Sequence, residues 1–233
     1  MNKKKLKIYT FLTSPKIVKI SAFIGLFTLA AAIIIGVIIA QYDPDNYNII
    51  DNYISDMGSF EHTPVPFIWD FAQMITAILM IPSAFYLEKL FRSFPNSDEG
   101  DKSISLNRRI LSSCFLISML SVIFGMFMVG LFSEDRTTIF QLHLVGSYIV
   151  WSGFALTSIF LGLLIWLYPS PIPKPIGIYM TVFPPIPCII FLTTFNKLSE
   201  WILMFSLITW IVPVAYILLK HINKEITSKH RVN

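Results

Sequence analysis

Residues 17–40, IVKISAFIGLFTLAAAIIIGVIIA, decide the fold class, because they form a long apolar run with one charged residue, Lys19. A bilayer core of roughly 30 Å takes about 20 helical residues to cross, and this run is long enough. Five further windows of the same kind follow. The predicted spans are Ile17–Ala40, Phe67–Leu90, Ile110–Phe132, Leu142–Leu167, Pro175–Phe195 and Trp201–Leu219. The sequence therefore predicts an all-α, polytopic membrane protein with a bundle of six transmembrane helices.

Composition agrees with this prediction. The chain of 233 residues is 55% hydrophobic and only 14% charged, which is more apolar than a soluble domain requires. No internal repeat or long linker divides it, so residues 1–233 are expected to form a single transmembrane domain. Cys114 and Cys188 fall inside predicted spans, and no disulfide framework is indicated.

The first apolar run follows four lysines, a feature that it shares with secretory signals. Signal cores, however, hold only about 7–15 apolar residues, and no small-x-small cleavage site follows this run. We therefore expect a retained span.

Basic residues indicate the orientation, because they accumulate on the cytoplasmic side of a membrane. With the N-terminus inside, all but Arg136 and Lys197 of the 18 lysines and arginines fall in inner segments. Acidic residues show the opposite bias. Both termini are predicted to be cytoplasmic, in a protein of the cell membrane. The net charge of +4 is then a topology signal and does not indicate nucleic-acid binding.

Two local patterns predict how the spans pack. Small residues at helical spacing on the first, third and fourth spans favour close packing of these three helices. In the fifth span, Pro184, Pro185 and Pro187 each remove a helix donor and crowd the preceding turn, so a kink or a break is expected. A broken helix often lines a ligand path, whereas a kink satisfied by neighbouring helices is the commoner arrangement.

The loop before the second span contains YISDMG, residues 53–58, in a segment without lysine or arginine. Ser55 or Asp56 followed by Gly58 is turn chemistry, because Asx side chains bond the backbone ahead and glycine accepts left-handed angles. The purely structural interpretation is that this turn shapes the re-entry into the membrane.

Three other polar residues are predicted near the same membrane surface. Asp70 lies one turn inside the second span, where an acid is expected to face protein or water. Asp135 lies in the turn between the third and fourth spans, and His143 opens the fourth. We expect these residues to converge with Asp56, which would accept hydrogen bonds from that turn or from His143.

Convergence leaves three interpretations open: a structural hydrogen-bonded network, recognition of a lipid headgroup or small ligand, and acid–base catalysis. Whether a metal binds is undecided, because only His62 and His143 lie on this side and a three-histidine zinc site is not available. Asp43-x-Asp45 lacks the third ligand and the glycine of a calcium loop. No nucleophile elbow, zinc-protease helix or phosphate loop occurs, and no cofactor is expected.

Two segments carry a family resemblance. NYISDMGSFEHTPVPFIWDFAQM (52–74) and GMFMVGLFSEDRTTIFQLHLVGSYIVW (125–151) resemble the six-span DRAM/Sfk/Frag membrane proteins and an allied prokaryotic family of unknown function. Ile54, Ser55, Asp56 and Gly58 match the Ile-Ser-Asp-x-Gly motif of their first outer loop, and Asp135 and His143 resemble the second motif. The resemblance implies a bundle with both termini inside. Relatives are linked to autophagy, phosphoinositide kinase recruitment, lipid asymmetry and GPI-lipid remodelling, but no shared reaction follows.

The sequence thus predicts a protein that recognises membrane lipids or serves membrane-lipid homeostasis without catalysis. One alternative is an intramembrane lipid-modifying enzyme that uses Asp56, Asp70, Asp135 and His143. Another is a small-solute or proton-coupled transporter built on the broken fifth span. Protein partners are not identified by the sequence.

Overall fold

The computed structural model describes residues 3–43, 47–93, 106–136 and 140–232, and within these ranges the chain is helical with no β-strand. Asp45, of the weak calcium-loop pattern, lies outside the described residues. Six helical segments are long and apolar enough to cross a membrane, as predicted. They are α2 (Pro15–Ala40), α3 (Phe67–Ser93), α4 (Leu106–Leu131), α5 (Leu142–Leu167), the pair α6 (Lys174–Val182) and α7 (Pro185–Thr194), and α8 (Lys197–Val232).

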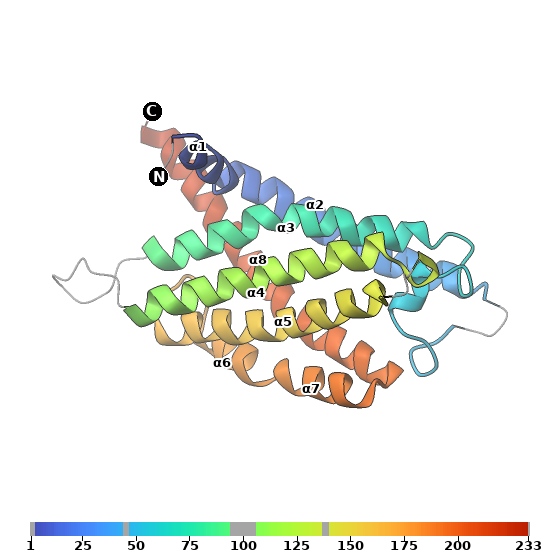
Figure 1. Ribbon diagram of the computed structural model, residues 1–233. Helices are drawn as coiled ribbons and strands as arrows, with labels where there is room; N and C mark the ends of the chain where they lie inside the picture. The colour runs from blue at the N-terminus through green and yellow to red at the C-terminus, as the bar shows by residue number, and fades with distance from the viewer. Residues whose placement is uncertain (1–2, 44–46, 94–105, 137–139, 233) are drawn as a thin grey trace.

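Three short helices complete the fold. Helix α1 (Lys3–Leu12) precedes the first span, and the 3₁₀ turns η1 (Ser55–Gly58) and η2 (Glu134–Arg136) lie between spans. Figure 1 shows α1 and both chain termini at one end of the bundle, and η1 and η2 at the other end. The predicted hexapeptide therefore lies at the end of the bundle opposite to the basic termini.

The packing prediction is confirmed for the third and fourth spans. A Cβ atom on Gly125 of α4 would lie only 2.8 Å from the Val150 backbone nitrogen of α5. A Cβ on Gly153 of α5 would lie 3.1 Å from the Val122 nitrogen, so both helices need glycine for their close approach. The prediction for the first span is wrong, because α2 packs mainly against α3, with Gly25 against Leu79, while Gly36 near its end faces Met57 of η1.

The fifth span is broken, as the prolines predict. Helix α6 ends with a hydrogen bond of 2.8 Å from the Phe183 amide to the Tyr179 carbonyl, and α7 begins at Pro185. A proline offers no amide to continue the ladder of the preceding turn, and two of them follow each other here. The interruption follows directly from local chemistry.

The orientation can be tested with single cysteines in a background without Cys114 and Cys188. Glu61 is exposed in the loop before α3, and Ser228 is exposed near the C-terminal end of α8. If basic residues set the topology, Glu61→Cys will react with an impermeant maleimide on intact cells, and Ser228→Cys will react only after permeabilisation. Labelling of Ser228→Cys on intact cells would overturn the predicted orientation.

Candidate functional site

The predicted site residues lie at one end of the bundle, where loops fold over the helix ends. We call this region the cap and define it as residues 47–66 together with η2. The cap contains Ser55, Asp56 and Gly58 in η1 and Asp135 in η2. Asp70 and His143 lie in the first turns of α3 and α5, directly beneath it. The fold thus brings all six residues to the same end, although their direct partners differ from those expected.

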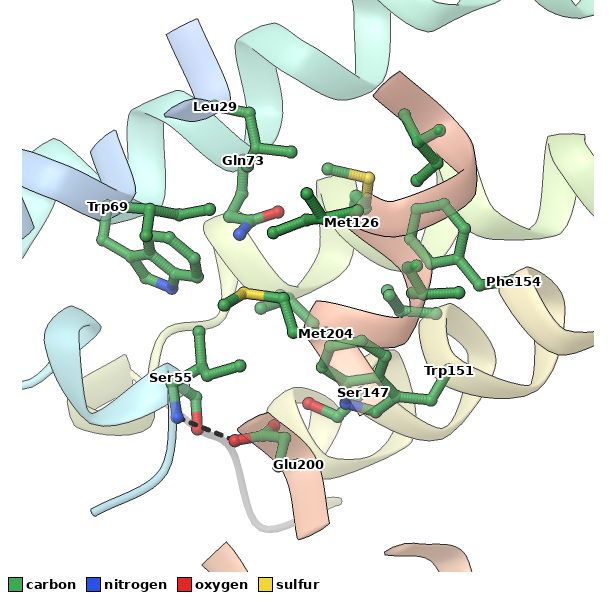
Figure 2. A pocket seen from close by; sticks show the side chains of 17 residues that line it. Leu29, Ser55, Trp69, Gln73, Met126, Ser147, Trp151, Phe154, Glu200 and Met204 are labelled. Carbon is green, nitrogen blue, oxygen red and sulfur yellow. Dashed lines mark hydrogen bonds between the residues drawn. The ribbon is translucent and has the colours of Figure 1, made fainter. Parts of the chain in front are cut away.

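One hydrogen bond holds η1 on the bundle. The Ile54 amide donates to Glu200 Oε2 of α8 at 2.7 Å, and Glu200 is 4% exposed (Figure 2). Next to this bond, the Trp201 indole nitrogen donates to the Asn52 carbonyl at 3.0 Å. Glu200 and Trp201 were absent from the predicted site, because an acid in the first turn of a helix is ordinary capping chemistry.

Gly58 is required by the close approach of η1 to α3. A Cβ atom at this position would lie 2.8 Å from Asp70 Oδ1 and 3.1 Å from the Trp69 ring. On the opposite side, Met57 is fully buried, and its sulfur would lie 2.7 Å from a Cβ on Gly36 of α2. The hexapeptide therefore fits between α2, α3 and α8 and is more than a solvated turn.

A cavity of about 100 Å³ lies beneath η1, enclosed by α2, α3, α4, α5 and α8. Figure 2 shows Ser55 and Glu200 at the end of the cavity next to η1, whereas Gln73 lies farther from η1, beside Leu29 and Met126. The rest of the wall is apolar or aromatic and includes Leu29, Met126, Phe154 and Met204. The ionisable group of the cavity is thus at the cap end, and most of the wall beyond it is apolar.

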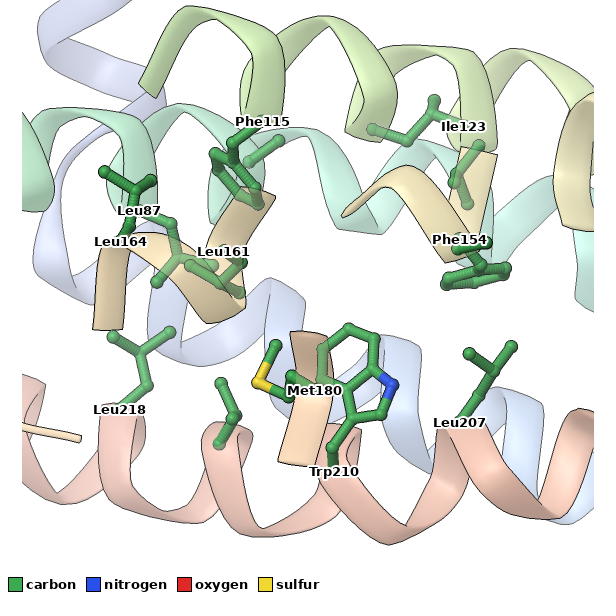
Figure 3. Packing of buried hydrophobic residues seen from close by; sticks show 14 of the residues in the cluster. Leu87, Phe115, Ile123, Phe154, Leu161, Leu164, Met180, Leu207, Trp210 and Leu218 are labelled. Atoms are coloured by element: carbon green, nitrogen blue, oxygen red, sulfur yellow. The ribbon is translucent and has the colours of Figure 1, made fainter. Parts of the chain in front are cut away.

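A second cavity of about 130 Å³ adjoins the first and shares Leu29, Phe154 and Ile211 with it. Its wall is almost entirely apolar. Figure 3 shows Leu87, Phe115, Leu161, Trp210 and Leu218, which contribute to this wall, within the buried core of the bundle. Helix α2 forms one side of both cavities and α8 the other.

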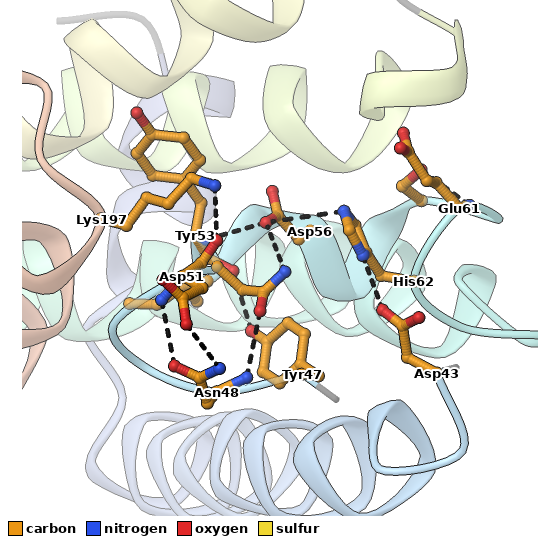
Figure 4. A network of polar contacts seen from close by, with 12 residues as sticks. Asp43, Tyr47, Asn48, Asp51, Tyr53, Asp56, Glu61, His62 and Lys197 are labelled. Carbon is orange, nitrogen blue, oxygen red and sulfur yellow. Dashed lines mark hydrogen bonds and ion pairs between the residues drawn. The ribbon is translucent and has the colours of Figure 1, made fainter. Parts of the chain in front are cut away.

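Above η1, Asp56 is the centre of a polar network (Figure 4). Its Oδ2 accepts a hydrogen bond of 2.8 Å from the Tyr53 amide and one of 3.4 Å from the Asn52 side chain. His62 Nε2 lies 3.8 Å from the same oxygen, and His62 Nδ1 lies 2.8 Å from Asp43 Oδ2. The histidine that faces Asp56 is therefore His62 of its own loop.

The expected contact between Asp56 and His143 is wrong. His143 Nδ1 instead makes a hydrogen bond of 2.8 Å with the Phe132 carbonyl at the end of α4. This bond satisfies a helix-end carbonyl, which would otherwise lack a partner. Glu134, in the turn between the third and fourth spans, lies beside Asp56, and the contact between the two carboxyl groups raises the pKa of Glu134.

Two further contacts attach the cap to η2. Asp135 accepts hydrogen bonds from the Ser59 hydroxyl at 2.9 Å and from the Phe60 amide at 2.7 Å. Arg136 Nη2 lies 2.6 Å from Asp70 Oδ2, and this aspartate side chain is only 3% exposed. Asp70 thus faces protein, as its depth predicts, and has a cation as partner.

The cap shifts the protonation of its acids and of His62. Burial, the Asp56 charge and the hydrogen bond with Asp56 raise the pKa of Glu134 to about 7. Burial also raises the pKa of Asp56, although the Tyr53 amide opposes this shift. For His62, burial lowers the pKa, but the hydrogen bond with Asp43 and the neighbouring carboxylates outweigh it and raise the pKa.

The geometry bears on the chemistry that the site can perform. Among the described residues, no three His, Cys, Asp or Glu side chains are grouped so that they could hold a metal ion. Asp56, Asp70 and Asp135 each accept bonds from neighbouring cap groups, which stabilise the fold of the cap. Of the described residues that line the two cavities, Glu200 is the one with an ionisable side chain.

No protein-family model matches the chain, and neither the curated proteins nor the solved structures include a significant match. The resemblance to the DRAM/Sfk/Frag proteins stays a prediction.

The three pKa shifts in the cap predict an unusual pH dependence. Raised pKa values mean that the folded cap binds more protons than the unfolded chain, so each group contributes stability that is lost as pH rises through its folded pKa. We expect the melting temperature in detergent to fall by a few degrees between about pH 6 and about pH 8. Glu134→Gln will flatten this dependence, because an amide stays neutral and can still donate to Asp56. Glu61→Gln, an exposed matched control, will keep the wild-type slope.

The ion pair between Asp70 and Arg136 can be measured by a double-mutant cycle. Removal of either partner leaves the other without an opposite charge beside it, so Asp70→Asn and Arg136→Gln will each destabilise the protein. The double mutant will be less destabilised than the sum of the two single mutants by about 1 kcal/mol. Asp70→Asn combined with Arg109→Gln, at an exposed position near the opposite end, will be additive. Additive behaviour of the first pair would show that the contact contributes nothing to stability.

Proposed function

We propose that the protein binds a membrane amphiphile in the two adjoining cavities between α2 and α8, as a lipid-recognition protein without catalysis. The observation that carries this proposal is the polarity of the cavities. Ser55 and Glu200 lie at the cap end, and the wall beyond them is mostly apolar. A lipid has the same order of groups, with a polar head at the membrane surface and a hydrocarbon chain beneath it.

The position of the cavities supports access from the membrane. Ile208 of α8 lines the first cavity and is 38% exposed on the bundle surface. Leu29 and Ile33 of α2, on the facing side, are half-buried. A hydrocarbon chain can therefore enter sideways between α2 and α8 without crossing the aqueous phase.

The alternatives have less support. The transporter alternative was based on the break between α6 and α7, where backbone carbonyls lose their helical partners. Neither helix contributes to the wall of the two described cavities. An enzyme would need Asp56, Asp70, Asp135 and His143 around one reacting atom. Their partners are instead a backbone amide, Arg136, Ser59 and the Phe132 carbonyl.

Blocking the meeting point of the cavities tests the proposal. Leu29→Trp fills the space that both cavities share, and we expect it to weaken binding of tritiated octadecanol at least about tenfold. Ile34→Trp is the matched control, because it adds the same bulk to the same helix at a position that is 60% exposed and lines neither cavity. Binding is measured in phosphocholine nanodiscs after subtraction of the uptake by empty nanodiscs.

Both variants must unfold at temperatures close to the wild type for the comparison to hold. Absence of saturable binding to the wild type, or equal affinity of Leu29→Trp and Ile34→Trp, would contradict the proposed function.

A further inference from the structure

Glu200 is a buried carboxyl group at the polar end of an apolar cavity. Its Oε2 accepts a hydrogen bond from the Ile54 amide, and the Trp151 side chain also hydrogen-bonds the carboxyl group, which contributes to the cavity wall. Among the described residues, no lysine, arginine or histidine nitrogen lies within 4.0 Å of it. Lys197, one turn earlier in α8, is instead bonded to the Asp51 carbonyl. Burial disfavours an ionised carboxylate that has no cation, so a ligand that supplies a cation would stabilise the charged form of Glu200.

The surrounding charges favour a cationic ligand over an anionic one. Asp56 and Glu134 act on Glu200 as further negative charges. The negative charge of this group of acids would repel a phosphate or carboxylate head in the cavity and attract an ammonium head. Trp69 and Trp151 line the same cavity, and the Trp151 side chain hydrogen-bonds Glu200.

A second buried group requires an acceptor. The indole nitrogen of Trp69 is a donor without a partner among the described residues, and Trp69 is 5% exposed. Figure 2 shows this nitrogen on the side of the cavity that also holds Ser55 and Glu200. An ammonium group cannot accept a hydrogen bond, so a ligand that satisfies both Glu200 and Trp69 needs an oxygen beside its amine.

The size of the cavities favours a single chain. An engineered cavity of about 150 Å³ holds one benzene molecule. Adjoining cavities of about 100 and 130 Å³ therefore have room for part of one slender hydrocarbon chain and not for the two chains of a phospholipid.

From these observations we propose that the bound amphiphile is a single-chain amino alcohol, with its ammonium group against Glu200 and its hydroxyl oxygen accepting from Trp69. This proposal rests on the proposed function, because it assigns the head of a ligand whose chain occupies the same cavities. It also assigns Glu200 and Trp69 as the residues that determine specificity.

Four probes with the same saturated chain length separate the head from the chain: sphinganine, octadecylamine, octadecanol and stearic acid. Binding is measured as above, in phosphocholine nanodiscs at neutral pH and with uptake by empty nanodiscs subtracted. We expect sphinganine to bind most tightly, followed by octadecylamine, octadecanol and stearate. The step from octadecanol to octadecylamine should be about tenfold or more, as expected for a hydrogen bond to a charged group.

Two variants test the two contacts separately. Glu200→Gln keeps an acceptor for the Ile54 amide and should bring octadecylamine to the affinity of octadecanol. Trp69→Phe should bring sphinganine to the affinity of octadecylamine. The matched controls are Glu61→Gln, at an exposed acid, and Trp166→Phe, at an indole that is 42% exposed and lines neither cavity. Both controls should keep the wild-type order of affinities.

The outcomes distinguish this proposal from the one on which it rests. If none of the four probes binds, both proposals fail. If all four bind equally, or stearate binds best, the chain site stands and the amino-alcohol assignment is wrong. If Glu200→Gln keeps the preference for amines while unfolding at the wild-type temperature, Glu200 does not hold the ammonium group and the assignment is equally wrong.

Discussion

The hydrogen bond from the Ile54 amide to Glu200 is the contact on which the cap depends. It joins residues 146 positions apart at a distance of 2.7 Å, and both groups are buried. A buried amide and a buried carboxyl each need a partner, so this bond fixes η1 against the first turn of α8. The positions of the neighbouring residues follow from it. Ser55 then lines the cavity, and Met57 packs against Gly36 of α2.

The other side of the cap is attached by charges. Asp135 of η2 holds the loop through Ser59 and the Phe60 amide, while Arg136 of η2 reaches Asp70 of α3. Because η2 follows α4, the cap is bonded to α8 on one side and to α3 and α4 on the other. The 3₁₀ turn η1 lies between these attachments and covers the first cavity. The raised pKa values of Glu134 and His62 reduce the negative charge of the cap and so the repulsion among its acids.

The sequence predicts the helices well and the partners of the site poorly, and the reason is the range of the interactions. Span length and the proline break are local properties, so hydropathy and backbone chemistry locate them within a few residues. Asp56, Asp70 and Asp135 are placed at one end correctly, because alternating spans bring every second loop to the same surface. The choice of His62 over His143 as the partner of Asp56 depends on how the loop folds back, which no periodic pattern encodes. Glu200 was missed because an acid in the first turn of a helix is ordinary capping chemistry, and only the folded cap removes it from water.

The chemical identity of Glu200 is informative beyond its position. If its role were only to accept the Ile54 amide, the neutral carbonyl of a glutamine would provide the same bond without burying an ionisable group. Replacing buried charged groups by neutral or apolar ones is often stabilising, so a carboxyl at this place is a poor choice for stability alone. It lies where the cavity changes from polar to apolar, between two tryptophans and beneath further acids. Selectivity depends on interactions that disfavour the wrong ligand as well as on those that favour the right one. A carboxyl group that is unfavourable in the empty fold and complementary to a cation meets this requirement for a cationic head.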